Sequence, residues 1–241
     1  MSAVKGAILR ELPGSQIVDI THLVPSFNIQ QAAYIVRNAW SAFPAGTVHI
    51  IGVNAEAGPS TPHIGIEYQG HFFIGADNGL FSLVFDKHPD LIVDLSIQQE
   101  NTIQTFPTRD VFVKAACHLA RGGTLEIIGK RKEGVNERSV FRPALSDNSI
   151  RGTAIYIDSY YNVVYNITSK LFHEVGKGRK YSISFKSHTI DKLSNRYGDV
   201  VEGEMLALFN SSGYLEIAQN RGGIGKLQNV QLNESITIEF Q

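Results

Sequence analysis

The pattern of hydrophobic residues changes near residue 145, and this change restricts the folds that the chain can adopt. Before that point strand-like and helix-like runs alternate, as in "NIQQAAYIVRNAWSAF" (28–43) and "TVHIIGV" (47–53). Such alternation predicts an α/β layer with a mostly parallel sheet. After residue 150 short strand-like runs are separated by glycine-containing turns, which predicts an all-β sandwich or small barrel.

Two domains are therefore expected, an α/β domain over residues 1–145 and an all-β barrel domain over residues 150–241, which 241 residues suffice to build. In the first domain "QIVDI" (16–20) is a predicted strand, and "HIGIEYQGHFFIGA" (63–76) reads as a hairpin that turns at Gln69-Gly70.

Composition excludes several classes of protein. Apolar residues make up 43% and charged residues 19%, which is typical of a globular chain. The 22 basic residues against 23 acidic ones give no overall basic field for nucleic acid. Cys117 is the only cysteine, so a reducing, cytoplasmic compartment is expected, and its apolar helical surroundings predict a buried, inert thiol. No apolar run reaches the length of a membrane span.

The eight histidines are scattered and form no HxH or HExxH motif, so no metal site is expected. Polar clusters follow or interrupt several strands, where α/β proteins often keep binding groups. One is the hinge Asp77-Asn78-Gly79 in "FFIGADNGLFSLVF", which suits either a turn or a ligand. The others are "THLVPSFN" (21–28), "GVNAEAGPSTP" (52–62), "TFPTRD" (105–110) and "IDSYYNVVYN" (157–166). Each of these alone is explained as an ordinary loop.

The order of these blocks, together with "GEMLALFNSSGYLEIAQNRGG" (203–223), resembles the S-adenosyl-L-methionine hydroxide adenosyltransferases, relatives of the fluorinases and chlorinases. The resemblance covers nearly the whole chain. It implies an N-terminal α/β domain, a C-terminal β-barrel and a homotrimer, with the ligand between the first domain of one subunit and the second domain of its neighbour. It also implies that the Asp77-Asn78-Gly79 hinge is architecture beside the site.

The reaction implied by the resemblance is displacement at the ribose C5′ of S-adenosylmethionine, which serves as substrate, with no cofactor, and expels methionine. The substrate contacts implied are aromatic surface from Phe27, Tyr160 and Tyr197, an adenine-edge amide from Asn162, a carboxylate for the methionine ammonium from Asp158, and hydroxyls for the methionine carboxylate from Ser211 and Ser212. Strand packing explains Tyr197 nearly as well. Asp158 and Asn162, four residues apart, are harder to explain by packing.

The chain departs from the family at the reacting centre. Where hydroxide-transferring members resemble one another in a water-holding Asp, Arg and His, this chain has Asn54, Thr61 or a neighbour, and Pro107. The halogenase pattern is not restored either, since Asn54 and Ala57 replace its Tyr and Thr. Asn54 and Thr108 are the remaining candidate catalytic residues. Hydrolysis is expected to be slow and to depend little on pH between 6 and 8.

A second departure lies at the start, because family members place a strand and an Asp-containing loop before the helix that matches "SAVKGAIL" (2–9). Either the sequence is truncated or half of the ribose site is lacking, and truncation is favoured. The leading hypothesis is an S-adenosylmethionine hydrolase. A non-catalytic protein that binds S-adenosylmethionine or adenosine is the alternative, and a halide-using transferase has the least support.

Overall fold

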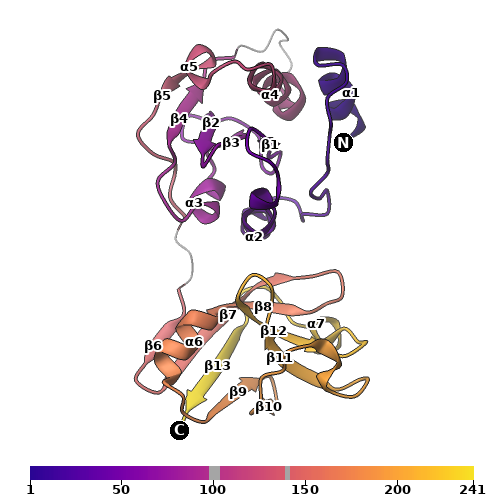
Figure 1. Ribbon diagram of the computed structural model, residues 1–241, viewed down its shortest axis with the longest axis vertical. Coiled ribbons are helices and arrows are strands. Elements are labelled where there is room, and N and C mark those ends of the chain that lie inside the picture. The colour runs from indigo at the N-terminus through magenta and orange to yellow at the C-terminus, as the bar shows by residue number, and fades with distance from the viewer. Residues whose placement is uncertain (98–103, 139–141) are drawn as a thin grey trace. The chain divides into compact units, whose positions relative to one another are not determined.

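The computed structural model describes residues 1–97, 104–138 and 142–241. The chain divides into two compact units, Met1–Ser139 and Val140–Gln241, which are described separately (Figure 1). The first contains helices and a sheet, and the second is dominated by strands. The predicted fold class, an α/β domain followed by an all-β barrel-like domain, is confirmed in this outline.

The first unit has a five-stranded sheet ordered β1-β3-β2-β4-β5. Its strands are β1 (Val48–Ile50), β2 (His63–Tyr68), β3 (His71–Ala76), β4 (Leu91–Leu95) and β5 (Gly129–Arg131). β1 and β3 pair in parallel, whereas β2–β3, β2–β4 and β4–β5 are antiparallel. The sheet is therefore mixed, and among these pairs the predicted parallel arrangement is limited to β1 and β3. The reason is the hairpin, because Gln69 and Gly70 both have positive φ and reverse the chain within two residues.

Helices cover both faces of this sheet (Figure 1). The helices of the first unit are α1 (Ser2–Glu11), which packs on α4, α2 (Ile29–Ala39), the 3₁₀ turn η1 (Trp40–Ala42), α3 (Leu80–Val84), the π-helical η2 (Thr108–Phe112), α4 (Val113–Ala120) and α5 (Leu125–Ile128). On β3, Phe73 packs with residues of α2 and α3, and its neighbour Ile74 packs with residues of η2 and α4. Successive side chains of a strand point to opposite faces, so both faces are buried.

The single cysteine is buried in the first unit. Cys117 is 2% exposed, and burial raises the pKa of its thiol, as expected for an inert cysteine.

Residues 16–20 do not form the predicted strand, and Val18 is 58% exposed. A strand requires a neighbour that completes its hydrogen-bond ladder, and in the described part of the chain no strand pairs with this segment.

An aromatic cluster in the first unit contains two buried histidines. The rings of His49 on β1 and His71 on β3 stack with their centroids 5.4 Å apart, and His49 Nε2 lies 3.2 Å from His71 Nδ1. His49 also stacks on Phe73, and Trp40 meets His71 edge-on. Burial, and secondarily the neighbouring His71, lowers the pKa of His49 to about 4.

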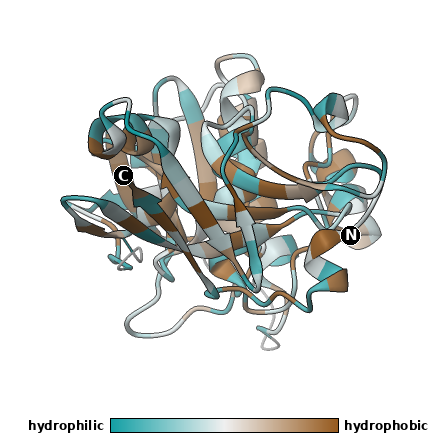
Figure 2. Ribbon diagram, turned by 90° about the horizontal axis from the view of Figure 1, so that it is seen from below, coloured by the Kyte–Doolittle hydropathy of each residue, from teal (hydrophilic) through white to brown (hydrophobic). Residues whose placement is uncertain are grey.

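The second unit is an antiparallel sheet ordered β10-β9-β13-β7-β8-β12-β11, with β6 added to β7. Its elements are β6 (Ala144–Ser146), β7 (Ser149–Ile157), β8 (Val163–Thr168), α6 (Ser169–Gly176), β9 (Tyr181–Phe185), β10 (His188–Ile190), the 3₁₀ turn η3 (Tyr197–Asp199), β11 (Met205–Phe209), β12 (Tyr214–Gln219), α7 (Ile224–Leu227) and β13 (Ser235–Phe240). Hydrophobic and hydrophilic residues alternate along several strands (Figure 2). A bridge between Leu193 and Ala207 spans from the end of β10 to β11, so the sheet is nearly closed.

In the described residues, no helix has the length and apolar character needed to span a membrane. The same residues bring no three His, Cys, Asp or Glu side chains together in a group that would suit a metal ion.

Candidate functional site

The loop that carries Asn54 follows β1 and is held by two side chains from other elements. Asn78 Nδ2 donates to the carbonyl oxygens of Val53 and Asn54, both at 3.0 Å. His63 Nε2 donates to the carbonyl oxygen of Ala55 at 2.9 Å. Asn54 itself has φ of 49°, a left-handed conformation that asparagine tolerates better than most residues. Its position is therefore set from outside the loop, while its side chain is exposed.

The hinge between β3 and α3 explains this support. Asn78 Oδ1 accepts from the backbone N–H of Leu80, so the same amide starts α3 and holds the Asn54 loop. The neighbouring Asp77 is fully buried and accepts from Lys132 Nζ and from the N–H of Asn136, both at 2.7 Å. The hinge thus joins three segments of the first unit, in agreement with the architectural role expected of it.

Thr108 lies beside the Asn54 loop. It begins η2, a π-helical turn, and such turns occur often at functional sites. A Cβ placed on Gly52 would lie 2.9 Å from Thr108 Oγ1, so the threonine side chain rests directly on the backbone of Gly52. The structure therefore brings Thr108 next to the loop of Asn54, while Pro107 is buried immediately before it.

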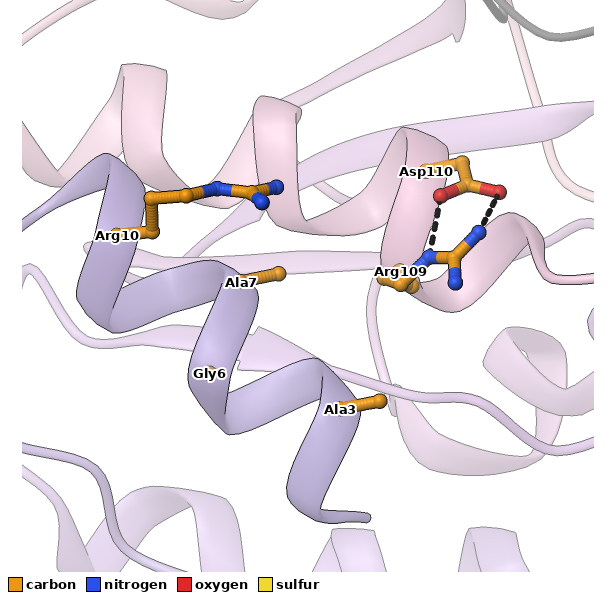
Figure 3. A pocket seen from close by; sticks show the side chains of 6 residues that line it. All are labelled: Ala3, Gly6, Ala7, Arg10, Arg109 and Asp110. Atoms are coloured by element: carbon orange, nitrogen blue, oxygen red, sulfur yellow. Dashed lines mark hydrogen bonds and ion pairs between the residues drawn. The ribbon is translucent and has the colours of Figure 1, made fainter.

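Arg109 and Asp110 follow Thr108 and pair with each other. Arg109 Nε lies 2.6 Å from Asp110 Oδ1, and Nη2 lies 2.9 Å from Oδ2. The hydrogen bonds from Arg109 lower the pKa of the Asp110 carboxyl. Both residues line a cavity of about 440 Å³ whose other wall is α1 (Figure 3). Its lining residues are Ala3, Gly6, Ala7, Arg10, Arg109 and Asp110. The cavity contains none of the nine residues that the sequence singles out.

Phe27 lies before α2, in the first unit. Its side chain is 78% exposed and its φ is 65°, a strained value for a bulky residue. Asn28 follows as the N-cap of α2 and accepts from the N–H of Gln31 at 3.0 Å. An exposed aromatic ring held at a helix start by strained backbone suits contact with a flat ligand.

In the second unit Asp158 and Asn162 hold the turn between β7 and β8. Asp158 Oδ1 accepts from the backbone N–H groups of Tyr160 (2.9 Å) and Asn162 (2.8 Å). Asp158 Oδ2 accepts from Asn162 Nδ2 at 3.0 Å. The pair therefore has a structural task that the sequence did not reveal. It also presents Tyr160, which is 74% exposed, at the tip of the turn.

Tyr197 in η3 and Asn210, which precedes the Ser211–Ser212 turn (the serine turn), both bond a buried carboxylate, Glu216 on β12. Tyr197 Oη donates to Glu216 Oε1 at 2.8 Å, and Asn210 Nδ2 donates to Oε2 at 3.1 Å. Asn210 Oδ1 in turn accepts from the N–H groups of Ser212 (3.0 Å) and Tyr214 (3.2 Å). Ser211 is exposed beside them.

Glu216 and Asn210 are the residues that the sequence did not indicate. Burial raises the pKa of the Glu216 carboxyl and the negative charge of Asp158 raises it further, while the bonds from Tyr197 and Asn210 oppose this shift. The only signal in the sequence is a glutamate inside the apolar run "YLEIA". In the second unit, Glu216 thus connects two predicted substrate-binding segments, Tyr197 and the Ser211–Ser212 turn. Asp158 lies close enough for its charge to raise the pKa of Glu216.

Comparison with known proteins shows which protein family both units of the chain match. The family model of the SAM hydroxide adenosyltransferase N-terminal domain matches residues 1–129, and that of the C-terminal domain matches residues 152–237. The chain is 26% identical to a protein of Methanocaldococcus jannaschii named (R)-S-adenosyl-L-methionine hydrolase, covering 100% of this chain and 90% of the relative. A protein of the same name from Thermus thermophilus is 28% identical, covering 92% and 87%.

Other matches agree with these. More distant relatives carry the name fluorinase. Among solved structures, an uncharacterized conserved protein from Thermotoga maritima superposes with a TM-score of 0.88 at 28% identity, covering 98% of this chain and 94% of that one. The similarity therefore extends over both units.

Proposed function

Because this chain belongs to the SAM hydroxide adenosyltransferase family, we propose that it hydrolyses S-adenosyl-L-methionine to adenosine and L-methionine. The observation that carries the proposal is the similarity of both units to relatives named for this hydrolysis. Their name also makes the (R)-sulfonium epimer the first substrate to test.

This displacement requires the attacking water to be aligned with the C5′–S bond, more than it requires acid or base groups. The oxygen of water forms a bond to C5′ as the C5′–S bond breaks, and the electron pair of that bond stays on sulfur. Methionine leaves as a neutral thioether and the water releases its proton to solvent. The sulfonium leaves without protonation, so the proposed reaction uses no metal or cofactor. The protein must hold the substrate in line with the water and exclude competing solvent.

Roles follow for the residues of the first unit. We assign the water to the Asn54 amide and the Thr108 hydroxyl, which is supported by the contact of Thr108 with Gly52 in the same loop. By the resemblance, the family's water-holding Asp, Arg and His are replaced here by Asn54, Thr61 or a neighbour, and Pro107, and proline has neither a side-chain donor nor an N–H. Losing one preorganised contact costs about 2.7–4 kcal/mol of barrier. Hydrolysis is therefore expected to be slow.

His63 adds a group that the sequence did not place near this centre. It bonds the Asn54 loop, and burial lowers its pKa, although the bond to Ala55 acts in the opposite direction. A lowered pKa disfavours the charged imidazolium of His63, which agrees with the weak pH dependence expected between pH 6 and 8.

The substrate itself is assigned mainly to the second unit. Asp158 would accept from the methionine ammonium, Asn162 would bond the adenine edge, and Ser211 and Ser212 would bind the methionine carboxylate. Tyr160, Tyr197 and, from the first unit, Phe27 would supply the aromatic surface.

We further propose a cytoplasmic homotrimer whose sites are shared between neighbouring subunits. The support is the division of the candidates: Phe27, Asn54 and Thr108 belong to the first unit, and the other six belong to the second. In a shared site, the first unit of one subunit would supply three of these nine residues and the second unit of its neighbour the other six.

The experiment incubates the protein separately with the (R)- and (S)-epimers of S-adenosylmethionine, with and without halide, and separates the products by chromatography. Adenosine formation that is slow in the wild type and faster in Asn54→Asp/Pro107→His supports hydrolysis. Binding without adenosine, even in that double variant, would favour a non-catalytic binding protein, a reading consistent with the neutral residues at the centre. A 5′-halo-adenosine product would favour the halide-using alternative.

A further inference from the structure

Glu216 is buried where a carboxylate is costly. It is 4% exposed, and its cross-strand neighbours are Leu208 on β11 and Val164 on β8. The adjacent Leu215 and Ile217 point to the opposite face, into the main core of this unit. A carboxylate in apolar surroundings destabilises the fold unless both of its oxygens are hydrogen-bonded.

Each oxygen of Glu216 has a partner from a different segment. Tyr197 belongs to η3, and Asn210 lies at the end of β11, thirteen residues further along the chain. Asn210 cannot turn its amide around without loss, because its Oδ1 already accepts from Ser212 and Tyr214. Its Nδ2 is therefore directed at Glu216, and the carboxylate links η3 to the serine turn.

We propose that Glu216 is a positioning residue, which fixes the Tyr197 ring relative to the Ser211–Ser212 turn before substrate arrives. This inference rests on the proposed function, in which Tyr197 contacts the nucleoside and the serines contact the methionine carboxylate. The two contacts recognise opposite ends of S-adenosylmethionine. A rigid connection between them favours a ligand that carries both ends. The entropy of ordering Tyr197 and the Ser211–Ser212 turn is then lost during folding and not during binding.

The electrostatics support this role. Burial and the nearby Asp158 disfavour a charged Glu216, while the two hydrogen bonds favour it. A neutral glutamine can replace both bonds: its Oε1 accepts from Asn210 Nδ2, and its Nε2 donates to the Tyr197 oxygen. Alanine can replace neither. The connection, and not the charge, is therefore the property to test.

The first test measures binding of S-adenosylmethionine and of adenosine by calorimetry in wild type, Glu216→Gln, Glu216→Ala and Ile217→Ala. Ile217→Ala is the matched control, since it destabilises the same strand from the core side. Glu216→Ala is expected to weaken S-adenosylmethionine binding at least about tenfold and adenosine binding by less, about threefold. Glu216→Gln and Ile217→Ala should both stay within about threefold of wild type.

The second test needs no ligand. Hydrogen exchange of the backbone amides of Tyr197–Asp199 and of Ser211–Tyr214 should increase together in Glu216→Ala and not in Ile217→Ala. If Glu216→Ala does not fold, Tyr197→Phe breaks the connection at one end and should raise exchange at η3. If the wild type binds neither S-adenosylmethionine nor adenosine, the proposed function is contradicted. Hydrogen exchange would still test whether Glu216 connects Tyr197 to the Ser211–Ser212 turn. Unchanged exchange, or equal losses in Glu216→Ala and Ile217→Ala, would overturn the inference.

Discussion

Acidification should destabilise this protein well above the pH at which carboxylates titrate, because of the buried His49–His71 pair. Burial lowers the pKa of His49 from 6.5 to about 4, so the folded state excludes a proton that the unfolded state binds. Above pH 6.5 the ring is neutral in both states and the full stability is present. As the pH falls below 6.5 only the unfolded state gains a proton, and stability is lost until the folded histidine protonates near pH 4.

The magnitude follows from this shift. Each pKa unit corresponds to about 1.36 kcal/mol, so a shift from 6.5 to about 4 amounts to at most about 3.4 kcal/mol. Between about pH 7.5 and about pH 5 the linkage relation gives a loss of about 2 kcal/mol. This is a substantial part of the about 5–15 kcal/mol by which domains are stable.

Urea denaturation at several pH values measures this loss as the change in the free energy of unfolding. His49→Gln should reduce the pH dependence, since its amide can still bond His71 but does not titrate. The control His188→Gln, at an exposed position, should retain the wild-type dependence. The pKa of His63 and of His71 is also lowered by burial, so the difference between variants, and not the wild-type slope, isolates His49. Equal slopes in wild type and His49→Gln would refute the reasoning.

Three further predictions concern the site. Gly52→Ala should push Thr108 away from the Asn54 loop, at a cost of about 1–3 kcal/mol in stability, and should lower the hydrolysis rate in a product assay, whereas Gly6→Ala, whose Cβ would meet nothing within 4 Å, should not. Asn162→Ala should weaken adenosine binding by about 1–3 kcal/mol; unchanged affinity in calorimetry would assign Asn162 to the turn alone. Sedimentation should show a trimer, and a stable monomer at micromolar concentration would contradict the shared site.

Local patterns revealed much of the fold. The helix-like run 28–43 forms α2, which buries Ala32, Ala33 and Val36, and the hairpin at Gln69-Gly70 forms where turn residues separate two β-rich runs. The sequence indicated less clearly which strands pair with each other. "QIVDI" has the composition of a strand, but composition cannot supply the neighbouring ladder, and the segment is unpaired in the described residues.

In the candidate site, too, local sequence patterns did not reveal contacts that depend on tertiary structure. Asp158 and Asn162 attract attention in the sequence, but their mutual hydrogen bonds depend on the turn geometry. Glu216 was missed because a polar residue between Leu215 and Ile217 normally marks the solvent face of a strand. Here Leu206, Leu208 and Ala218 form a second apolar cluster on the Glu216 side of the sheet, and only tertiary packing shows that this side is covered as well.

Around the reacting centre that we propose at Asn54 and Thr108, the contacts favour catalysis by position over catalysis by charge. The Asn54 loop is held by the amide of Asn78 and by His63, whose charged form is disfavoured because burial lowers its pKa. The guanidinium of Arg109, next to Thr108, is not directed at the proposed water, because it forms two hydrogen bonds with Asp110. A water between Asn54 and Thr108 would thus be oriented by neutral groups, which can align it but stabilise little developing charge. Such a centre suits a sulfonium substrate, which leaves without help, and limits the rate at which water attacks.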